Sequence, residues 1–295
     1  MKEMSFVIVT YHSQKDIINC IDSIYKTADI PIEKIEIIVV ENGSKEAFEE
    51  TKNLIKNRFT ESVLMYHNVE NGGYGQGNNI GIKLATAEII AIVNPDVIFV
   101  RPIFAQALEI FKKNSSVAII GGNQLGGDNM SFWIRPEFDF FIFTAPICRI
   151  LNKLNIYIEK YFFLSGALLF IDKEKFEKIG GFDEKIFMYC EESDIINRLL
   201  KKKSSTLYKK DFIYKHLIDD RTETSDSNLL ILLKSYKYYL EKHKFSYRSF
   251  LERRILSLKV MVFFYNLLNK KSVAVIKKRY LKIFENKLKD LKNEG

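Results

Sequence analysis

The chain has 295 residues, 47% hydrophobic and 28% charged, which excludes a mostly disordered protein because this composition supplies a sizeable core. Its formal net charge of +8 is unevenly distributed: residues 229–295 hold 17 Lys and Arg against 5 Asp and Glu, whereas residues 1–228 carry a net charge of −4. Length and charge together favour one large domain, residues 1–228, followed by a basic extension, residues 229–295.

In chain order, residues 1–122 alternate short β-branched runs with helical patterns. Strands are predicted at 5–11, 35–41, 63–67, 89–94 and 117–122, and helices at 14–27, 45–58, 77–87 and 103–113. Apolar runs separated by helices are typical of parallel strands that are buried on both faces. The pattern therefore predicts a doubly wound, mostly parallel α/β sheet, which binds ligands at the carboxyl ends of its strands.

An irregular, aromatic-rich segment follows at 123–160. A strand is predicted at 163–171, then a short helix that Asp172 caps and Gly180 ends. Another helix is predicted from Glu191 to about Lys201. From Leu229 onward the pattern is helical and amphipathic, with Lys and Arg interleaved among aromatic and aliphatic residues.

The cysteines and the apolar stretches indicate the compartment. Cys20, Cys148 and Cys190 are odd in number and far apart, which favours reduced thiols. The first residues lack the pattern of a signal peptide, and the apolar stretches 161–171 and 255–268 are shorter than the roughly 20 residues that a membrane span needs. We therefore expect a cytoplasmic protein that does not cross a membrane.

Polar residues follow the first four predicted strands, which places them along one edge of a parallel sheet. The segments are Thr10-Tyr11-His12, Glu41-Asn42-Gly43-Ser44, His67-Asn68 and Asn94-Pro95-Asp96. Taken singly, most of these are ordinary turn residues. The two acids, Glu41 and Asp96, fit that interpretation less well and suggest a site for a ribose or a metal ion.

Residues 71–81 contain five glycines and precede a predicted helix. Such a segment either presents backbone N–H groups to a phosphate or simply forms a tight turn. Its glycine spacing does not give the dinucleotide fingerprint, and the Lys-Ser/Thr of a P-loop is absent. The sequence therefore supports neither a dehydrogenase nor a P-loop ATPase.

Three acids in four residues, Glu191, Glu192 and Asp194, begin the predicted helix at 191. The helix dipole favours acids at this end whatever their function. Crowding would also raise the pKa of at least one of these carboxyl groups, which suits a general base. Both interpretations stay open at this point.

Taken together and in order, these segments resemble those of the family 2 glycosyltransferases, which have the GT-A fold and use nucleotide-sugar donors. The resemblance covers about residues 5–220 and rests on Val7–Tyr11, Val39–Ser44, Asn71–Gly81, Asn94–Asp96, Ser165–Ala167 and Gly180–Asp194. Asn94-Pro95-Asp96 looks like the variant found in rhamnosyltransferase-like members. A dTDP-rhamnose or UDP-sugar donor is therefore favoured.

The resemblance implies roles for individual residues. Glu192 falls at the position of the catalytic base, with Glu191 as its competitor, and Asp96 and His216 would hold Mg²⁺ or Mn²⁺ on the diphosphate. The residues implied to bind the nucleotide sugar are Thr10, Tyr11, Glu41, Asn42, Gly73, Gly77, Asn78, Asn94, Asp96, Ser165, Gly166 and Ala167. Most relatives carry Asp where Glu41 and Glu192 stand.

The resemblance also implies the type of reaction. Asn197–Leu200 stands where processive members carry an Arg-Trp motif, which favours transfer of a single sugar per catalytic event. The implied base, Glu192, would direct attack on the anomeric carbon from the face opposite the leaving group, so we expect inversion. The acceptor would be a saccharide or lipid-linked saccharide in cell-surface polysaccharide synthesis. The alternatives are a sugar nucleotidyltransferase, although Tyr11–Lys15 is no Gly-rich basic loop, and a non-catalytic scaffold with a degenerate site.

Two interpretations of the basic extension stay open. It would lie against the anionic inner face of the cell membrane, as a peripheral membrane protein does, or its helices would pack and form an oligomer. Nucleic acid is disfavoured as a partner because the main domain is acidic.

Overall fold

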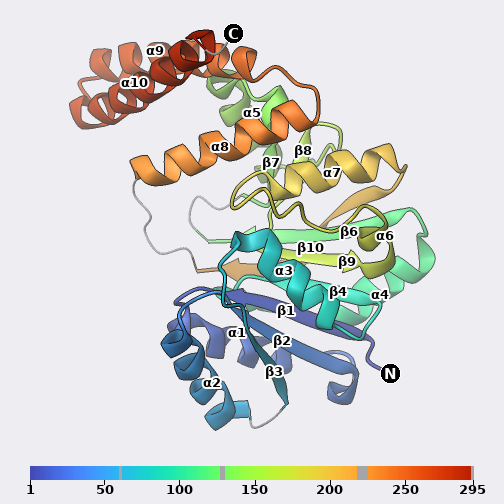
Figure 1. The fold of residues 1–295 in the computed structure, drawn as a ribbon. Helices are drawn as coiled ribbons and strands as arrows, with labels where there is room; N and C mark the ends of the chain where they lie inside the picture. Colours follow the sequence, from blue (N-terminus) through green and yellow to red (C-terminus); the bar gives the residue numbers. More distant parts are fainter. Residues whose placement is uncertain (60–61, 127–129, 218–224, 294–295) are drawn as a thin grey trace. The chain divides into compact units, whose positions relative to one another are not determined.

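The computed structural model describes residues 1–59, 62–126, 130–217 and 225–293. The chain forms two compact units (Figure 1). The first comprises residues 1–133 and 163–222, and the second comprises residues 134–162 and 223–295. The sequence-based division after residue 228 placed residues 134–162 in the first domain, whereas their contacts assign them to the second unit.

The first unit is built on one sheet that has, in the described part of the chain, eight strands in the order β3-β2-β1-β4-β9-β6-β10-β5. Their bounds are β1 Met4–Thr10, β2 Ile35–Glu41, β3 Val63–His67, β4 Ile89–Val93, β5 Val97–Phe99, β6 Val117–Leu125, β9 Leu168–Asp172 and β10 Ser205–His216. A separate two-stranded sheet pairs β7 (Phe132–Ile134) with β8 (Phe162–Leu164).

The strand directions bring many chain ends to one edge of this sheet. β1 pairs in parallel with β2 and β4, β2 with β3, and β6 with β10. β9 runs antiparallel between β4 and β6, and β5 runs antiparallel to β10. The carboxyl ends of the parallel strands therefore meet the amino ends of β9 and β5 at a common edge.

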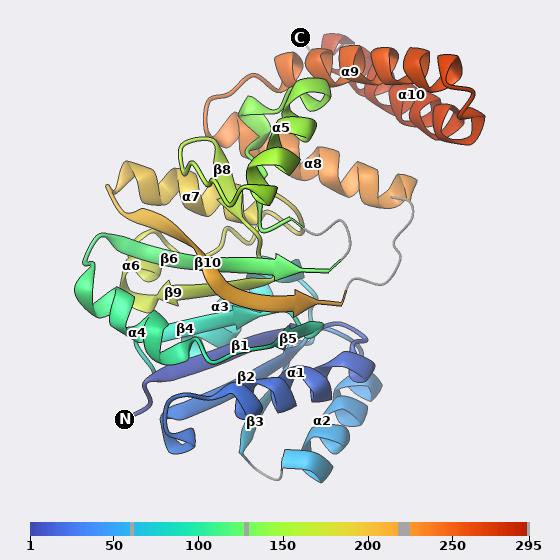
Figure 2. The same cartoon turned by 180° about the vertical axis from the view of Figure 1, so that it is seen from behind.

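Helices cover both faces of the sheet (Figures 1 and 2). The helices of this unit are α1 Gln14–Thr27, α2 Lys45–Phe59, α3 Gly73–Leu84, α4 Phe104–Lys113, α6 Lys173–Lys178 and α7 Glu191–Lys201. α1 and α4 lie on the face that Figure 2 shows in front, and α3 lies on the other face. The mostly parallel α/β sheet predicted from the sequence is confirmed.

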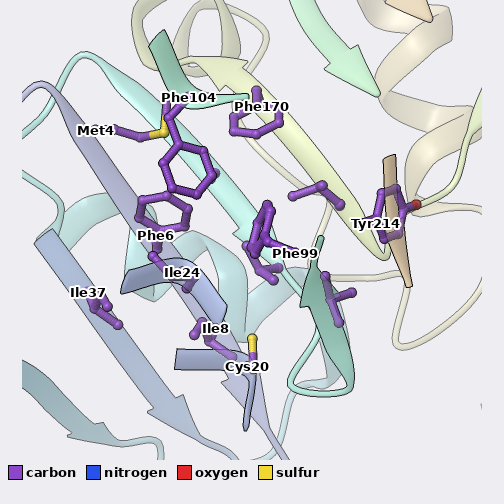
Figure 3. Close-up of a cluster of buried hydrophobic side chains, with 14 of the residues drawn as sticks. Met4, Phe6, Ile8, Cys20, Ile24, Ile37, Phe99, Phe104, Phe170 and Tyr214 are labelled. Carbon is purple, nitrogen blue, oxygen red and sulfur yellow. The ribbon is translucent and has the colours of Figure 1, made fainter. Parts of the chain in front are cut away.

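The largest core lies beneath α1 and α4 and is rich in aromatic rings (Figure 3). Phe6 on β1 makes edge contacts with Phe99 and Phe104, at ring-centroid distances of 6.0 and 4.9 Å. Ile17 and Ile21 of α1 complete this cluster and are fully buried. Burial of each such side chain stabilises the folded state by about 1.5–3 kcal/mol. This core therefore holds α1 and α4 firmly against the sheet.

Several predicted elements differ from the observed ones. Helix α3 begins at Gly73 and ends at Leu84, so the predicted start at Gly77 and end at residue 87 are wrong. The single strand predicted at 163–171 is two strands, because the chain leaves one sheet after Leu164 and enters the other at Leu168. β5 was not predicted, since three residues are too few for a periodic pattern.

The second unit is mainly helical. It contains α5 Phe141–Lys153, α8 Asp226–Lys242, α9 Tyr247–Leu267 and α10 Lys271–Asn293. The inserted segment is joined to the C-terminal helices by polar contacts: Arg254 pairs with Asp139 at 3.1 Å, and the Tyr239 hydroxyl donates to Glu137 at 2.7 Å. Within the described residues, no helix combines the length and hydropathy that crossing a membrane requires.

Candidate functional site

The common edge of the sheet collects most residues that the sequence singled out. Thr10 ends β1, Glu41 ends β2 and His216 ends β10. Asn94 follows β4, and Asp96 lies in the turn that leads to β5. Ser165, Gly166 and Ala167 immediately precede β9 and reach the same edge because β9 runs antiparallel to β4.

Glu41 is fully buried, and its carboxylate is saturated by neighbouring donors. It accepts hydrogen bonds from the Thr10 hydroxyl at 2.6 Å, the Thr51 hydroxyl at 3.3 Å and the Gly43 N–H at 2.8 Å. Such bonding compensates the cost of burying a carboxylate. Glu41 therefore orders the backbone that follows β2, and a direct contact of Glu41 with a nucleotide stays a prediction.

A second polar network joins this backbone to the glycine-rich helix. The Asn42 amide donates to the Gly73 carbonyl at 3.1 Å, and the Asn68 amide donates to Asn42 and to Gln76, both at 2.9 Å. Asn68 was among the polar residues that the sequence placed at this edge, whereas Gln76 was missed because an isolated amide side chain has no periodic signature. Their network fixes the amino end of α3 beside β2.

The glycines of α3 permit close packing. Gly73 has φ +90°, and a Cβ atom there would lie 1.9 Å from the Phe187 carbonyl oxygen. A Cβ atom at Gly77 would lie 2.7 Å from the Val9 side chain, and Asn78 beside it is 1% exposed. These residues are accounted for by helix packing, so their role in nucleotide binding stays a prediction.

Asp96 and His216 lie together, as the resemblance implied. His216 Nε2 is 3.1 Å from Asp96 Oδ1, and the side chains are 11% and 16% exposed, respectively. The Asn94 amide is 3.5 Å from the same ring nitrogen. A carboxylate oxygen and an imidazole nitrogen fit a divalent cation as part of its donor set. The described residues contain no group of three or more His, Cys, Asp and Glu arranged to hold a metal, so the remaining donors would come from a ligand.

The 165–167 turn connects this pair to the acidic helix. The Asn94 N–H donates to the Ala167 carbonyl at 2.9 Å, and the Tyr74 hydroxyl donates to the Gly166 carbonyl at 2.7 Å. The Ser165 hydroxyl donates to Gln124 at 3.0 Å. The turn is thus held from three sides, which places Gly166 in a fixed position.

Glu192 is the acid that faces this turn. A Cβ atom on Gly166 would lie 2.1 Å from Glu192 Oε1, so the carboxylate occupies the space that the glycine leaves. Burial raises the pKa of Glu192 to about 7. Hydrogen bonds from the backbone of Glu192 itself and of Gly166 act in the opposite direction and lower this pKa, but burial has the larger effect. Glu192 lines a small cavity of about 10 Å³ together with apolar side chains, among them Leu164, Ile195 and Ile196. These apolar neighbours remove water from the carboxylate, which accounts for the raised pKa.

The other two acids of the cluster have different environments. Glu191 is 3% exposed, and burial, reinforced by the Glu192 and Asp194 charges, raises its pKa well above the usual range. Asp194 is fully buried and accepts from Arg198 Nε at 2.8 Å. Of the three, Glu192 is the one that is only partly buried and contacts the Gly166 turn.

The sequence missed one residue that holds Gly166 and lies within the electrostatic influence of the acids. Tyr74 is half-buried, and desolvation and the Glu192 and Glu191 charges raise its pKa. It lies in the glycine-rich segment, where sequence reasoning attended only to the glycines. Tyr11, by contrast, is 58% exposed beside the edge, and its role stays a prediction.

Known proteins are similar to this chain over most of the first unit, up to residue 180 in the family match. The family model described as "Glycosyl transferase family 2" matches residues 5–180, more than half of the chain. This segment includes β1 to β4, the Asn94-Pro95-Asp96 turn and the Gly166 turn.

Individual relatives are more distant. The chain is 30% identical over 189 residues to an uncharacterized glycosyltransferase of Rickettsia felis, covering 62% of this chain and 29% of that protein. It is 24% identical over 203 residues to the low-salt glycan biosynthesis hexosyltransferase Agl10 of Haloferax volcanii, covering 67% of this chain and 62% of that one. The chain thus spans less than two thirds of the length of either relative.

Among solved structures, the fold is similar to that of the mannosyltransferase PcManGT from Pyrobaculum calidifontis in complex with GDP-Man and Mn²⁺. The TM-score is 0.59 at 14% identity, and the alignment covers 97% of this chain and 86% of that one. At this identity the likeness shows the fold alone, a GT-A-type arrangement.

Proposed function

Because the chain belongs to glycosyl transferase family 2, we propose that it is a hexosyltransferase that moves one sugar residue from a nucleoside-diphosphate sugar to an acceptor hydroxyl with inversion. The observation that carries this proposal is the position of Glu192, a partly buried carboxylate with a pKa raised to about 7, against the fixed Gly166 turn. A carboxylate of this kind accepts a proton near neutral pH.

In the proposed reaction Glu192 removes the proton of the acceptor hydroxyl. The hydroxyl oxygen forms a bond to the anomeric carbon from the side opposite the diphosphate, and the bond from that carbon to the diphosphate oxygen breaks. The nucleoside diphosphate leaves with the electron pair. Glu191 is too buried to reach an acceptor, so we assign it to the protonated, structural state that its raised pKa favours.

Asp96 and His216 would hold Mg²⁺ or Mn²⁺ on the donor diphosphate. When bound, such an ion supplies positive charge that stabilises the leaving diphosphate. Support comes from the 3.1 Å distance between Asp96 and His216 and from the PcManGT complex, which contains Mn²⁺ with GDP-Man. The Asn94 amide lies 3.5 Å from the same His216 ring nitrogen that faces Asp96.

We propose that the nucleotide binds at the carboxyl ends of β1 and β2 and the amino end of α3. Here Glu41 acts by ordering the Asn42–Ser44 backbone through its hydrogen bonds, and Tyr11 offers an exposed ring. A dTDP-rhamnose or UDP-sugar donor remains our preference from the Asn94-Pro95-Asp96 sequence.

The acceptor is proposed to be a saccharide or a lipid-linked saccharide in cell-surface polysaccharide synthesis. The relative Agl10 is named for glycan biosynthesis, which supports this class. The basic second unit would let a cytoplasmic enzyme work at the inner face of the membrane, where lipid-linked acceptors are presented.

The proposal is tested by incubating the purified chain with Mn²⁺ and each of a panel of nucleotide sugars, and measuring release of nucleoside diphosphate. Release that falls about 10²-fold or more in Glu192→Gln, with unchanged donor affinity, is expected. Formation of pyrophosphate from a nucleoside triphosphate and a sugar phosphate would instead identify a nucleotidyltransferase. Donor binding without any turnover would identify a scaffold.

A further inference from the structure

The hairpin of α9 and α10 exposes an unusual number of apolar side chains near its turn. One side of α9 is buried through Phe250, Leu251, Ile255 and Leu258. A second set is between 52% and 70% exposed: Leu256, Phe263, Phe264, Leu267, Leu268 and Val275. Single exposed apolar residues are ordinary. Here the spacing of Leu256, Phe263 and Leu267 places them along one side of the helix, so they form a stripe.

The same hairpin is strongly basic. Residues 253–284 hold nine Lys and Arg and no Asp or Glu. Three of the nine pair with acids outside this range: Arg254 with Asp139, Lys259 with Glu285 and Arg279 with Asp226. Lys270, Lys271 and Lys278 are exposed and flank the apolar set at the turn. The hairpin tip, residues 256–278, therefore combines exposed Phe and Leu side chains with lysines.

This combination restricts the kind of partner. A second copy docking tip to tip would bring two basic surfaces together, which is electrostatically unfavourable. A nucleic acid would bind the lysines but leave the Phe and Leu side chains in water. An anionic bilayer surface satisfies both, since its phosphates attract Lys and its interface accepts Phe and Leu.

We propose that the hairpin tip binds the surface of an anionic phospholipid bilayer, with Phe263, Phe264, Leu267 and Leu268 in the interface and Lys270 and Lys271 at the headgroups. The inference rests on the proposed function only for the biological role of the binding, which would hold the enzyme where a lipid-linked acceptor lies. The binding itself is a property of the second unit and does not require catalysis.

The test is co-sedimentation of the full chain with vesicles of phosphatidylcholine alone and of phosphatidylcholine mixed with phosphatidylglycerol. Binding to the mixed vesicles should be at least about tenfold tighter. Lys270→Glu with Lys271→Glu should weaken it by about tenfold or more, and Phe263→Ser with Leu267→Ser by a similar factor. Circular dichroism would check that each variant keeps its helices.

A matched charge control lies on the same helix. Lys289→Glu with Lys292→Glu makes the same change of net charge roughly 27 Å farther along α10 and should leave binding nearly unchanged. Equal weakening by both pairs would show that overall charge, rather than the tip, governs binding and would overturn the proposal.

Two further results would also overturn it. One is equal binding to neutral and anionic vesicles. The other concerns α5, where Ile147 and Ile150 are exposed. The proposal is overturned if the double variant Ile147→Ser with Ile150→Ser loses vesicle binding while the tip variants still bind. Release of nucleoside diphosphate from a donor without vesicles is measured separately, so a failure of the proposed enzyme activity remains distinguishable from a failure of membrane binding.

Discussion

The carboxylate of Glu192 lies directly against the α-carbon of Gly166, at a distance that admits no side chain on the glycine. Two segments that are 26 positions apart thus depend on each other: the turn before β9 must lack a Cβ atom for the acid at the start of α7 to occupy its place. This relationship makes Gly166 a positioning residue for the proposed base.

Gly166→Ala tests this dependence. The added methyl group would displace the Glu192 carboxylate, so kcat should fall by about 10²-fold while the nucleotide-binding edge is retained. Kinetics of the single variants and of Gly166→Ala with Glu192→Gln would be compared. If Gly166 acts through Glu192, the double variant is no slower than Glu192→Gln alone. Additive losses would contradict this.

Tyr74→Phe should lower kcat by about tenfold, because the Gly166 carbonyl loses its hydrogen bond from the Tyr74 hydroxyl and the turn loosens. Because Tyr74 acts through the turn, the pH profile of kcat should also change as the environment of Glu192 changes. Tyr25→Phe is a control, since the Tyr25 hydroxyl donates to the exposed Ser62, away from the Gly166 turn. An unaltered pH profile in Tyr74→Phe would argue against a positioning role.

The raised pKa of Glu192 also predicts a pH-dependent stability. The folded state holds the proton up to pH about 7, whereas an unfolded glutamate releases it near pH 4.5. The folded state is therefore destabilised progressively as the pH rises from about 4.5 to 7. Glu192→Gln removes this effect, so its gain in unfolding free energy over the wild type should be on the order of 2 kcal/mol above pH 7 and vanish below pH 4.5.

Denaturant unfolding at several pH values would measure this difference. Glu109→Gln, on an exposed helix surface, provides the comparison, because its carboxyl pKa is lowered by Lys113 rather than raised by burial. A gain for Glu192→Gln that is the same at pH 5 and pH 8 would show that the carboxyl group is not desolvated.

Asp194→Asn is expected to affect folding rather than chemistry. It would break the ion pair with Arg198 in which Asp194 is fully buried, at a cost of about 3 kcal/mol or more. The exposed pair of Arg248 and Glu252 gives the matched control, since Arg248→Ala should cost less than about 1 kcal/mol. Thermal unfolding would separate the two, and equal losses would refute the assignment of Asp194.

Asp96→Ala is expected to abolish the dependence of nucleotide affinity on Mn²⁺. The wild-type chain should bind nucleoside diphosphate about tenfold or more tightly with Mn²⁺ than without it. Calorimetric titrations of both proteins, with and without the ion, provide the measurement. Retention of the Mn²⁺ effect in the variant would rule out Asp96 as a ligand.

Local pattern predicted most of the sheet because β1, β2 and β4 are buried and rich in Val and Ile, and the edge strand β3 keeps a short apolar run. Helix α7 was predicted with its observed start, since the acids at 191, 192 and 194 favour a helix N-terminus. The beginning of α3 could not be predicted in this way. Glycine disfavours helices, so the glycines of α3 hid its beginning. They are needed there because α3 packs so closely against Val7, Val9 and Phe187 that a Cβ atom would not fit.

The site was predicted only as a set of residue types. The sequence indicated that Asp96, His216 and Glu192 belong together, but it gave no sign that Glu41 would be enclosed by Thr10 and Thr51 or that Tyr74 would support Gly166. These are long-range contacts that depend on strand order and helix packing. Hydrogen bonding between distant side chains leaves no periodic trace in a single sequence.

The hydrogen bonds around Glu41 have a thermodynamic consequence for ligand binding. Because this carboxylate already fixes the Gly43 N–H, the conformational entropy of the segment after β2 is lost during folding rather than on association. A nucleotide that docks there meets a preorganised backbone and spends little of its interaction energy on ordering it. Thr51→Val, which removes one of the hydrogen bonds to Glu41, would transfer that entropic cost back to the binding step.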